Sequence, residues 1–246
     1  MDKRRRRVLI KLSGEALAGD GGHGFCDATI EKIAVDLVKA KQHGTKMALV
    51  VGGGNFWRGR SGKHIDRVRA DQIGMLATVM NALYLAESFR KLGLRSEVMT
   101  PMPFANMTTV YEKRNAQKLM DRGKLVIHAA GLCHPFFSTD TVTALRAAEI
   151  DATCVLYTKN GVSGVYDKIP TDPTARIYKT LSYGVAIKND LQFADSTALS
   201  ILTEAKLPSF VFGLNENAGI SRICENLSQH PGFGTLLKTE TEEIFY

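Results

Sequence analysis

The chain has 246 residues, of which 44% are hydrophobic and 23% are charged, and its formal net charge is +7. This length suits one large α/β domain or two small ones, and no apolar run is long enough to span a bilayer. The apolar stretch at residues 8–10 is too short for a signal peptide. Four scattered cysteines without a C-x-x-C pair favour free thiols. We therefore expect a cytoplasmic protein with no membrane partner.

Much of the positive charge lies in one basic run, Lys-Arg-Arg-Arg-Arg at residues 3–7. Such a run is typical of a nucleic-acid-binding arm or of a solvated tail. The rest of the chain is near charge balance and lacks basic residues interleaved with aromatic ones, which favours the tail. We expect no nucleic-acid partner, and a mildly basic body suits small anionic substrates.

The first predicted strand covers residues 8–12 and ends at Ser13 and Gly14. Lys11 interrupts this apolar run close to its carboxyl end. A lysine in that position either extends its amine to solvent at the sheet edge or binds phosphate. This segment alone leaves both interpretations open.

Residues 19–24 match the dinucleotide-binding pattern G-x-G-x-x-G literally. That fingerprint requires a strand directly before it and a helix that opens from it, whereas residues 15–18 separate this segment from the strand. We therefore predict a mobile surface loop or a hairpin and no dinucleotide site. A helix follows, with Asp27 as its expected N-cap and a stop at His43 and Gly44.

A second glycine-rich segment gives a stronger signal, because it follows directly on the predicted strand of residues 48–51. Gly52, Gly53 and Gly54, called the glycine cradle below, leave their backbone N–H groups bare, and such amides bind anions. Arg58 adds a forked donor for phosphate oxygens. We favour a phosphate site at the carboxyl end of a parallel strand over a flexible turn.

The spacing of apolar residues predicts a long helix over residues 66–92. Its apolar surface is wider than one stripe, which indicates deep burial or contact with another subunit. Asp71 lies in the first turns of this helix. It is either an ordinary carboxylate near a helix start or an acceptor for sugar hydroxyls.

Strands at residues 96–99 and 124–128 flank a predicted helix at 111–122, and the loop 131–138 follows. This loop leads into a helix capped by Ser138 or Thr139, and a helix N-terminus with hydroxyls is an anion site.

Two pairs of side chains in the same loop invite a chemical role. Phe136 and Phe137 either stack on a base or anchor the loop in the core. Cys133 and His134 lack further ligands at metal spacing and a triad context. We therefore expect no metal site and no cysteine nucleophile at this loop.

The C-terminal half continues the same alternation, so the two halves form two lobes on one mostly parallel sheet and meet near residue 151. Strands are predicted at residues 152–157, 209–212 and 234–237, helices at 181–189, 195–205 and 218–227, and a turn-rich hairpin at 159–167.

The order of the motifs resembles that of the bacterial UMP kinases (uridylate kinases) of the amino acid kinase family. The motifs are Lys-Leu-Ser-Gly-Glu-Ala-Leu at 11–17, the glycine cradle with its flank at 52–59, Gly-Met-Leu-Ala-Thr at 74–78, Pro-Phe-Phe-Ser-Thr-Asp-Thr at 135–141, Gly-Val-Tyr at 164–166 and Asp-Ser-Thr-Ala at 195–198. The resemblance covers residues 8–237. The motif at 74–78 separates UMP kinases from the acetylglutamate, carbamate and aspartate kinases that share the fold.

This resemblance implies one α/β domain, a three-layer αβα sandwich with a central, mostly parallel sheet. Residues 8–151 would form the phosphate-acceptor lobe and residues 152–238 the ATP-binding lobe. The implied reaction is the reversible transfer of the γ-phosphoryl group of ATP to UMP, with Mg²⁺ held mainly by ATP rather than by protein ligands. The family also implies pyrimidine nucleotide biosynthesis, a cytoplasmic homohexamer, activation by GTP and inhibition by UTP.

The resemblance also assigns residues to each nucleotide. The residues expected to meet ATP are Lys11, Leu12, Ser13, Gly14, Gly54, Arg58, Asn160 and Tyr166. Those expected to meet UMP are Gly53, Asp71, Leu132, Cys133, His134, Pro135, Phe136, Phe137, Ser138 and Thr139. The expected catalytic residues are Lys11, Arg58, Asp140 and Asp195. The two aspartates would orient Lys11 or hydrated Mg²⁺ and would not act as bases.

The chain departs from the family pattern at three places. Leu132, Cys133 and His134 replace the usual Thr-Gly-Asn, so backbone contacts remain and His134 is a candidate donor in place of Asn. Ile169 replaces an aspartate expected near the adenine, and Ser163 replaces the aspartate of Val-Asp-Gly.

Two alternatives remain at this point. The nearest is another amino acid kinase, which would phosphorylate a carboxylate or a carbamate. The other is a nucleotide-binding regulator or a nucleic-acid-binding protein with an inactive site, but the intact Lys11, Asp140 and Asp195 argue against it.

Overall fold

The computed structural model describes residues 6–57, 64–227 and 229–246. Within these residues, ten strands form one sheet in the order β10-β7-β9-β8-β6-β1-β2-β5-β3-β4. The strands are β1 (Arg7–Leu12), β2 (Lys46–Val51), β3 (Ser96–Thr100), β4 (Thr109–Val110), β5 (Leu125–His128), β6 (Cys154–Lys159), β7 (Tyr178–Ser182), β8 (Ser209–Gly213), β9 (Thr235–Lys238) and β10 (Ile244–Phe245). Only the β8–β9 and β7–β10 pairs are antiparallel.

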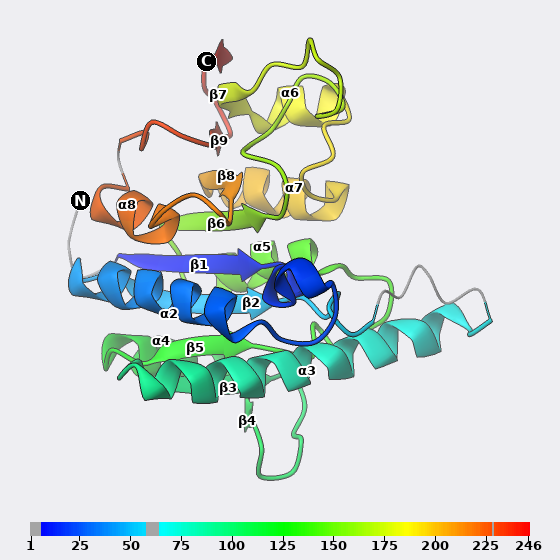
Figure 1. Ribbon diagram of the computed structural model, residues 1–246, viewed down its shortest axis with the longest axis vertical. Coiled ribbons are helices and arrows are strands. Elements are labelled where there is room, and N and C mark those ends of the chain that lie inside the picture. The colour runs from blue at the N-terminus through cyan, green and yellow to red at the C-terminus, as the bar shows by residue number, and fades with distance from the viewer. Residues whose placement is uncertain (1–5, 58–63, 228) are drawn as a thin grey trace.

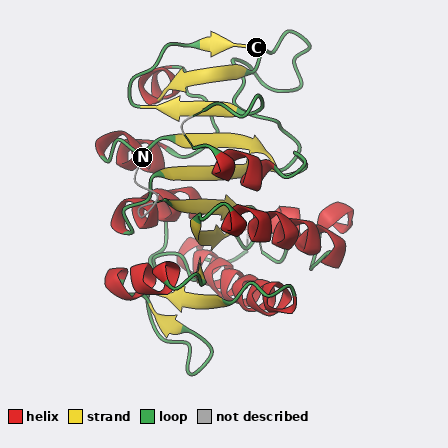
Figure 2. Cartoon of the chain, turned by 90° about the vertical axis from the view of Figure 1, so that its left-hand side faces the viewer, coloured by secondary structure: helices red, strands yellow, loops and turns green. Residues whose placement is uncertain are grey.

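Helices cover both faces of this sheet. They are α1 (Gly14–Leu17), the 3-10 turn η2 (Gly19–Gly21), α2 (Asp27–Gln42), α3 (Arg67–Lys91), α4 (Lys113–Asp121), α5 (Thr139–Glu149), α6 (Tyr183–Lys188), α7 (Ser196–Glu204) and α8 (Gly219–Glu225). One buried core joins the sheet to α2, α3 and α8, and a second joins it to α4, α5, α6 and α7. The fold is therefore the expected three-layer αβα sandwich (Figures 1 and 2).

The alternation along β1 explains these two cores. Ile10 packs into the core with α2 and α3, whereas its neighbour Leu9 packs into the core with α5 and α7. Successive side chains of a strand point to opposite faces, so a strand buried on both faces is apolar throughout. The same alternation sends Lys11 towards the face that α5 and α7 cover.

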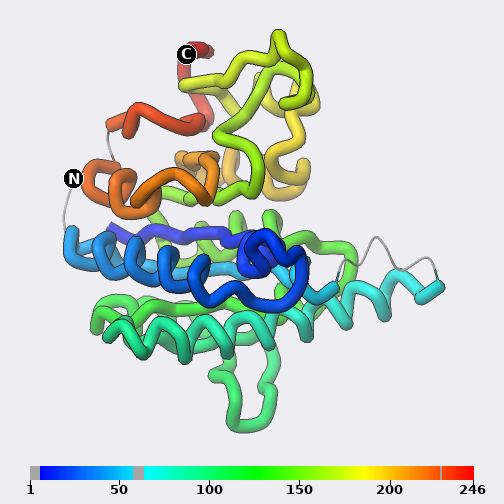
Figure 3. The backbone as a smooth tube through the Cα atoms, in the orientation of Figure 1, coloured from blue at the N-terminus to red at the C-terminus, as the bar shows by residue number. Residues whose placement is uncertain are grey.

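The strand order separates the two halves of the chain. The five strands after residue 151 occupy one half of the sheet, and the five before it occupy the other, with β6 and β1 at the border. Figure 3 shows the later segments, yellow to red, above the earlier ones. The division near residue 151 coincides with this border, and the separate roles of the two lobes stay a prediction.

Most long elements agree with the sequence-based expectations, and the expected N-cap at Asp27 is wrong. Cys26 occupies the N-cap of α2, and Asp27 is the first helical residue. The carboxylate of Asp27 instead accepts a hydrogen bond of 2.5 Å from the hydroxyl of Tyr84 on α3. By contrast, Asp66 caps α3 and accepts from the amides of Val68 and Arg69.

The segment 181–189 also differs from the prediction of one helix. Its first two residues complete β7, and α6 begins at Tyr183 with Ser182 as its cap. β7 is held by β9 and β10, which are distant in the sequence. Local periodicity cannot reveal such pairing, which overrides helix propensity. In the part of the chain that the structure describes, no helix combines the length and apolarity needed to cross a membrane.

Candidate active site

A cavity of about 440 Å³ opens at one edge of the sheet. β1 is paired in parallel with β2 and β6, and β2 with β5, so the carboxyl ends of these strands meet at the same edge. Lys11 and Gly54, which were expected to meet ATP, and Gly53 and Thr139, which were expected to meet UMP, all line this cavity. The position agrees with the rule that open α/β sheets bind ligands beyond the carboxyl ends of their strands.

The glycine cradle forms part of the cavity wall. Its backbone lies in close contact with the backbone of neighbouring segments. A Cβ atom on Gly14 would lie 2.5 Å from the carbonyl oxygen of Gly52 and 2.6 Å from the amide nitrogen of Gly54. A Cβ atom on Gly53 would lie 2.9 Å from the carbonyl oxygen of Gly74 on α3. These positions therefore require glycine for space, which supports an anion cradle over a flexible turn.

Two buried asparagines hold the cradle in place. Asn81 on α3 donates from Nδ2 to the carbonyl oxygen of Gly52 at 2.7 Å. Asn55 and Asn81 also exchange two amide hydrogen bonds, of 2.7 and 3.0 Å. Both side chains are essentially inaccessible to solvent. Asn81 was missed in the sequence, because nothing in the local pattern shows which strand end a helical Asn will face.

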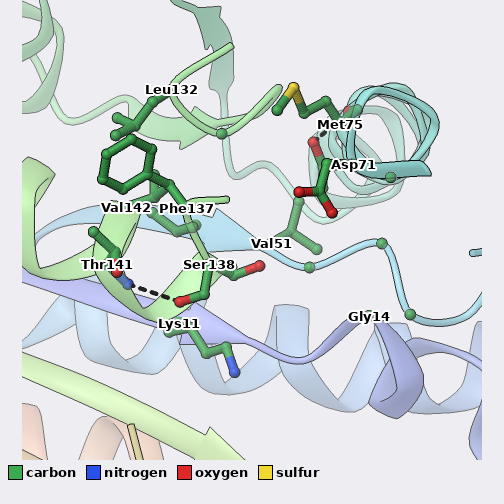
Figure 4. Close-up of a pocket in the computed structure, with 18 of the residues that line it drawn as sticks. Lys11, Gly14, Val51, Asp71, Met75, Leu132, Phe137, Ser138, Thr141 and Val142 are labelled. Atoms are coloured by element: carbon green, nitrogen blue, oxygen red, sulfur yellow. Dashed lines mark hydrogen bonds between the residues drawn. The ribbon is translucent and has the colours of Figure 1, made fainter. Parts of the chain in front are cut away.

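Lys11 lies at the centre of the site and is paired with Asp140. Its amine is 3.1 Å from Oδ1 of Asp140, and the two side chains are 12% and 19% exposed. Asp140 lies in the first turn of α5. Figure 4 shows Lys11 beneath Ser138 and Thr141, with Asp71 and Met75 across the cavity. The expectation that all three cradle amides are bare is wrong for Gly52, whose amide donates to the carbonyl oxygen of Leu12 at 3.0 Å as the sheet pairing of β1 and β2 continues. A cation held by one carboxylate next to the amides of Gly53 and Gly54 is suited to bind a phosphoanion.

Ser138, rather than Thr139, caps α5. Its hydroxyl accepts from the amides of Asp140 at 3.0 Å and Thr141 at 3.1 Å, and it donates to Oδ2 of Asp195. Thr141 also donates to Asp195, at 2.9 Å. Asp195 in turn caps α7 by accepting from the amide of Ala198. This network joins the starts of α5 and α7.

The network also sets the charge of Asp195. Burial alone would raise its pKa, but hydrogen bonds from Ser138, the amide of Ala198 and Thr141 together hold the pKa below its usual value. Asp195 is therefore a carboxylate at neutral pH, and it lines the cavity.

Asp71 faces the cavity from α3 and holds the 131–138 loop. Both its oxygens accept from Nε of Arg67 at 2.9 Å, and Oδ2 accepts from the backbone amide of Phe136 at 2.9 Å. The guanidinium of Arg67 also lies 5.4 Å from the centre of the Phe136 ring. Arg67, which the sequence analysis missed, thus braces both Asp71 and the loop.

The residues of the 131–138 loop that were expected to meet UMP fall into two groups. Leu132, Phe136 and Phe137 line the cavity, and the two phenylalanines are 69% and 50% exposed. The alternative that these rings anchor the loop in the core is therefore wrong. Cys133, His134 and Pro135 lie outside the cavity lining. Partial burial raises the pKa of Cys133, which keeps it a thiol and gives no support for a nucleophile.

The residues expected to meet ATP are also divided. Ser13, Gly14 and Gly54 line the cavity, whereas the side chain of Leu12 is fully buried in the core. Asn160 and Tyr166 lie in the segment between β6 and β7, outside the cavity lining.

Arg58 and Lys159 are two further cationic residues to consider for the ATP site. Arg58, expected to meet ATP and to act in catalysis, lies outside the described residues. Lys159, at the end of β6, was missed, although it carries the signal that marked Lys11, a lysine at the carboxyl end of a strand.

Comparisons with known proteins place the chain among close relatives. A family model described as "Amino acid kinase family" matches residues 6–213. The curated protein "Uridylate kinase" of Pediococcus pentosaceus is 44% identical over 221 residues, which are 89% of this chain and 92% of that protein. The crystal structure of UMP kinase from Bacillus anthracis is 34% identical, with 98% of both chains covered and a TM-score of 0.92. UMP kinase from Ureaplasma parvum is 30% identical, covers 95% of this chain and 99% of its own, and has a TM-score of 0.87.

Proposed function

The chain belongs to the amino acid kinase family, and from this membership and the cavity we propose that it is a UMP kinase. Such an enzyme is a phosphotransferase of pyrimidine nucleotide synthesis that converts ATP and UMP into ADP and UDP. The observation that carries the proposal is the convergence of the glycine cradle, Lys11 and the N-terminus of α5 on one cavity. The 44% identical relative named uridylate kinase supports UMP as the acceptor.

Phosphoryl transfer asks the protein mainly to position two anions and to neutralise their charge. Lys11 bridges the transferring group, and the amides of Gly53 and Gly54 stabilise charge on the phosphate oxygens. Asp140 orients the amine of Lys11, from which it lies 3.1 Å away. No strong base is needed, because the second pKa of a phosphate monoester is about 6 and its oxygen is already nucleophilic at neutral pH.

The acceptor and the donor occupy opposite sides of the cavity in this proposal. UMP binds with its phosphate at Gly53 and Thr139, its ribose at Asp71 and its base along the 131–138 loop. The exposed rings of Phe136 and Phe137 support stacking on the base. ATP binds along residues 11–14 and Gly54 and extends towards Asn160 and Tyr166, and Arg58 adds a further cation. Leu12 contributes through its backbone, since its side chain is buried.

The donor set fits Mg²⁺ carried by the nucleotide. Within the described residues, no three His, Cys, Asp or Glu side chains are grouped to hold a metal. Mg²⁺ commonly binds through substrate phosphates and one or two carboxylates and keeps several waters. Asp195, which lines the cavity, and Asp140 would hold Mg²⁺ or its waters. When bound with ATP, Mg²⁺ supplies positive charge against the phosphate oxygens.

We extend the proposal to a cytoplasmic homohexamer that GTP activates and UTP inhibits. The exposed apolar side chains of α3 support a subunit contact: Ile73, Leu76 and Met80 are 37%, 52% and 50% exposed. The free cysteines are consistent with a reducing compartment. Sedimentation and initial rates with and without GTP or UTP test these features.

The reaction is tested by coupled ADP release with UMP, CMP, dUMP, acetylglutamate and carbamate as acceptors. We expect release that depends on UMP, with weaker use of dUMP because Asp71 would lose a ribose hydroxyl. Turnover with acetylglutamate or carbamate would identify a different amino acid kinase. ATP turnover without any acceptor would contradict the proposal altogether.

A further inference from the structure

Lys159 ends β6 beside the strand that carries Lys11. β6 pairs in parallel with β1, and Lys11 is in register with Tyr157. Side chains two residues apart on a strand share a face, so Lys159 lies one step beyond Tyr157 on the face that Lys11 shares. α5 and α7 cover this face, and Figure 1 shows β1 and β6 running in the same direction. The two lysines therefore stand on neighbouring strands at the same edge of the sheet.

The partner of Lys159 differs from that of Lys11. Lys11 is paired with the carboxylate of Asp140, whereas the amine of Lys159 donates to the backbone carbonyl oxygen of Phe193. Among the described residues, Lys159 forms no ion pair. A half-buried cation that has only a neutral acceptor is costly, and such groups cluster at functional sites.

Charged side chains near Lys159 belong to three neighbouring elements, β1, α5 and α7. Burial lowers the pKa of Lys159, the carboxylate of Asp140 on α5 opposes this effect, and the amine of Lys11 on β1 adds to it. Asp195, at the start of α7, already accepts hydrogen bonds from Ser138, Thr141 and the amide of Ala198. The carboxylates of Asp140 and Asp195 are thus bound to other donors.

We propose that Lys159 is a second phosphate-binding lysine, which contacts the phosphates of the donor nucleotide. This inference rests on the UMP kinase function proposed above. Asn160, the next residue, begins the segment expected to meet the adenine nucleotide, and Lys159, which like Asn160 lies just outside the cavity lining, ends the strand next to the one that carries Lys11. On binding, its amine exchanges the neutral Phe193 carbonyl for phosphate oxygens, and the new hydrogen bond is stronger because its donor and its acceptor are both charged.

A purely structural role is the competing explanation. In that case Lys159 only ties the segment before α7 to β6 through Phe193. The two roles predict effects on different nucleotides. Loss of a phosphate ligand weakens the use of ATP, whereas loss of the contact with Phe193 disturbs Asp195 and with it the whole site.

The test compares Lys159→Met, Lys159→Arg and the control Lys188→Met, which removes an exposed lysine from α6 in the same lobe. We measure kcat/KM for ATP at saturating UMP, KM for UMP, and the thermal midpoint. Lys159→Met should lower kcat/KM for ATP by about 100-fold, the usual cost of losing one charge-stabilising donor, with KM for UMP and the midpoint kept. Lys159→Arg should recover part of this loss, and Lys188→Met should match the wild type.

Wild-type kcat/KM for ATP in Lys159→Met would overturn the inference. So would an equal loss of ATP and UMP use in both Lys159 variants together with a lower midpoint. Calorimetric titration of ATP into the wild type and Lys159→Met separates this inference from the proposed function. A wild type that binds ATP but does not phosphorylate UMP contradicts the function alone, and equal ATP affinity of the two proteins contradicts the role of Lys159 alone.

Discussion

The chain contains two glycine-rich segments that look alike in sequence and differ in what faces them. At Gly21, Gly22 and Gly24 an added Cβ atom would meet nothing within 4 Å, and Gly22 and Gly24 adopt φ values of +68° and +74°. In the glycine cradle, by contrast, an added Cβ atom on Gly53 would lie 2.9 Å from backbone. The first segment uses glycine to turn the chain. The second uses it to bring backbones together around a cavity.

The largest effect should come from the lysine that the cradle faces. Lys11→Ala removes the cation expected to bridge the transferring phosphoryl group, so we expect turnover to fall by about a thousandfold while circular dichroism shows an intact fold. Coupled ADP release with UMP gives the measurement, and Lys32→Ala, an exposed lysine on α2, is the control. Near-normal turnover of Lys11→Ala would refute its role.

A methyl group in the cradle should have the next largest effect. The Cβ atom of Gly53→Ala would lie 2.9 Å from the carbonyl oxygen of Gly74 and 3.0 Å from Cβ of Ala77, both on α3. α3 must therefore shift, at a cost of about 1–3 kcal/mol in the free energy of unfolding. We expect a lower midpoint in urea unfolding and a clear loss of kcat/KM for UMP. Unchanged stability and activity would mean that the cradle tolerates a side chain.

Asp71, which also lies on α3, allows the UMP site to be distinguished from the ATP site by experiment. Asp71→Asn weakens the contact of the two Asp71 oxygens with Nε of Arg67 and the proposed contact with ribose. KM for UMP should rise about tenfold, the value of one charged hydrogen bond, with KM for ATP unchanged. Glu87→Gln, an exposed carboxylate further along α3, is the control. A change in ATP dependence alone would reverse the assignment of the two nucleotide sides.

The open glycine segment should give the smallest effect. Gly21→Ala meets nothing within 4 Å and needs no left-handed backbone. The free energy of unfolding should change by no more than about 0.5 kcal/mol, and kcat/KM for both substrates should equal that of the wild type. A loss as large as that of Gly53→Ala would erase the distinction between the two segments.

The sequence could distinguish these segments because the deciding feature is local. The cradle follows directly on an apolar strand, whereas the literal G-x-G-x-x-G is separated from its strand by residues that form α1. Lys11 and Asp71 were identified for the same reason, since each lies at a recognisable place on a predicted element. The boundaries of α3 and the capping of α5 by Ser138 also follow from local patterns.

What the sequence could not reveal depends on contacts between distant segments. Asn81 reaches Gly52, Arg67 braces Phe136, and Asp195 joins the starts of two helices. Each pairing is fixed by how a helix packs on the sheet, which no local spacing encodes. The replacement of the first two residues of the predicted 181–189 helix by the end of β7 has the same cause.

The most direct test of the central claim is a crystal structure with UMP and a non-hydrolysable ATP analogue. The account predicts that the UMP phosphate lies within hydrogen-bond distance of the Gly53 amide and Thr139, and that Lys11 lies between it and the terminal phosphate of the analogue. A UMP phosphate bound elsewhere, or terminal phosphates separated from Lys11, would contradict it.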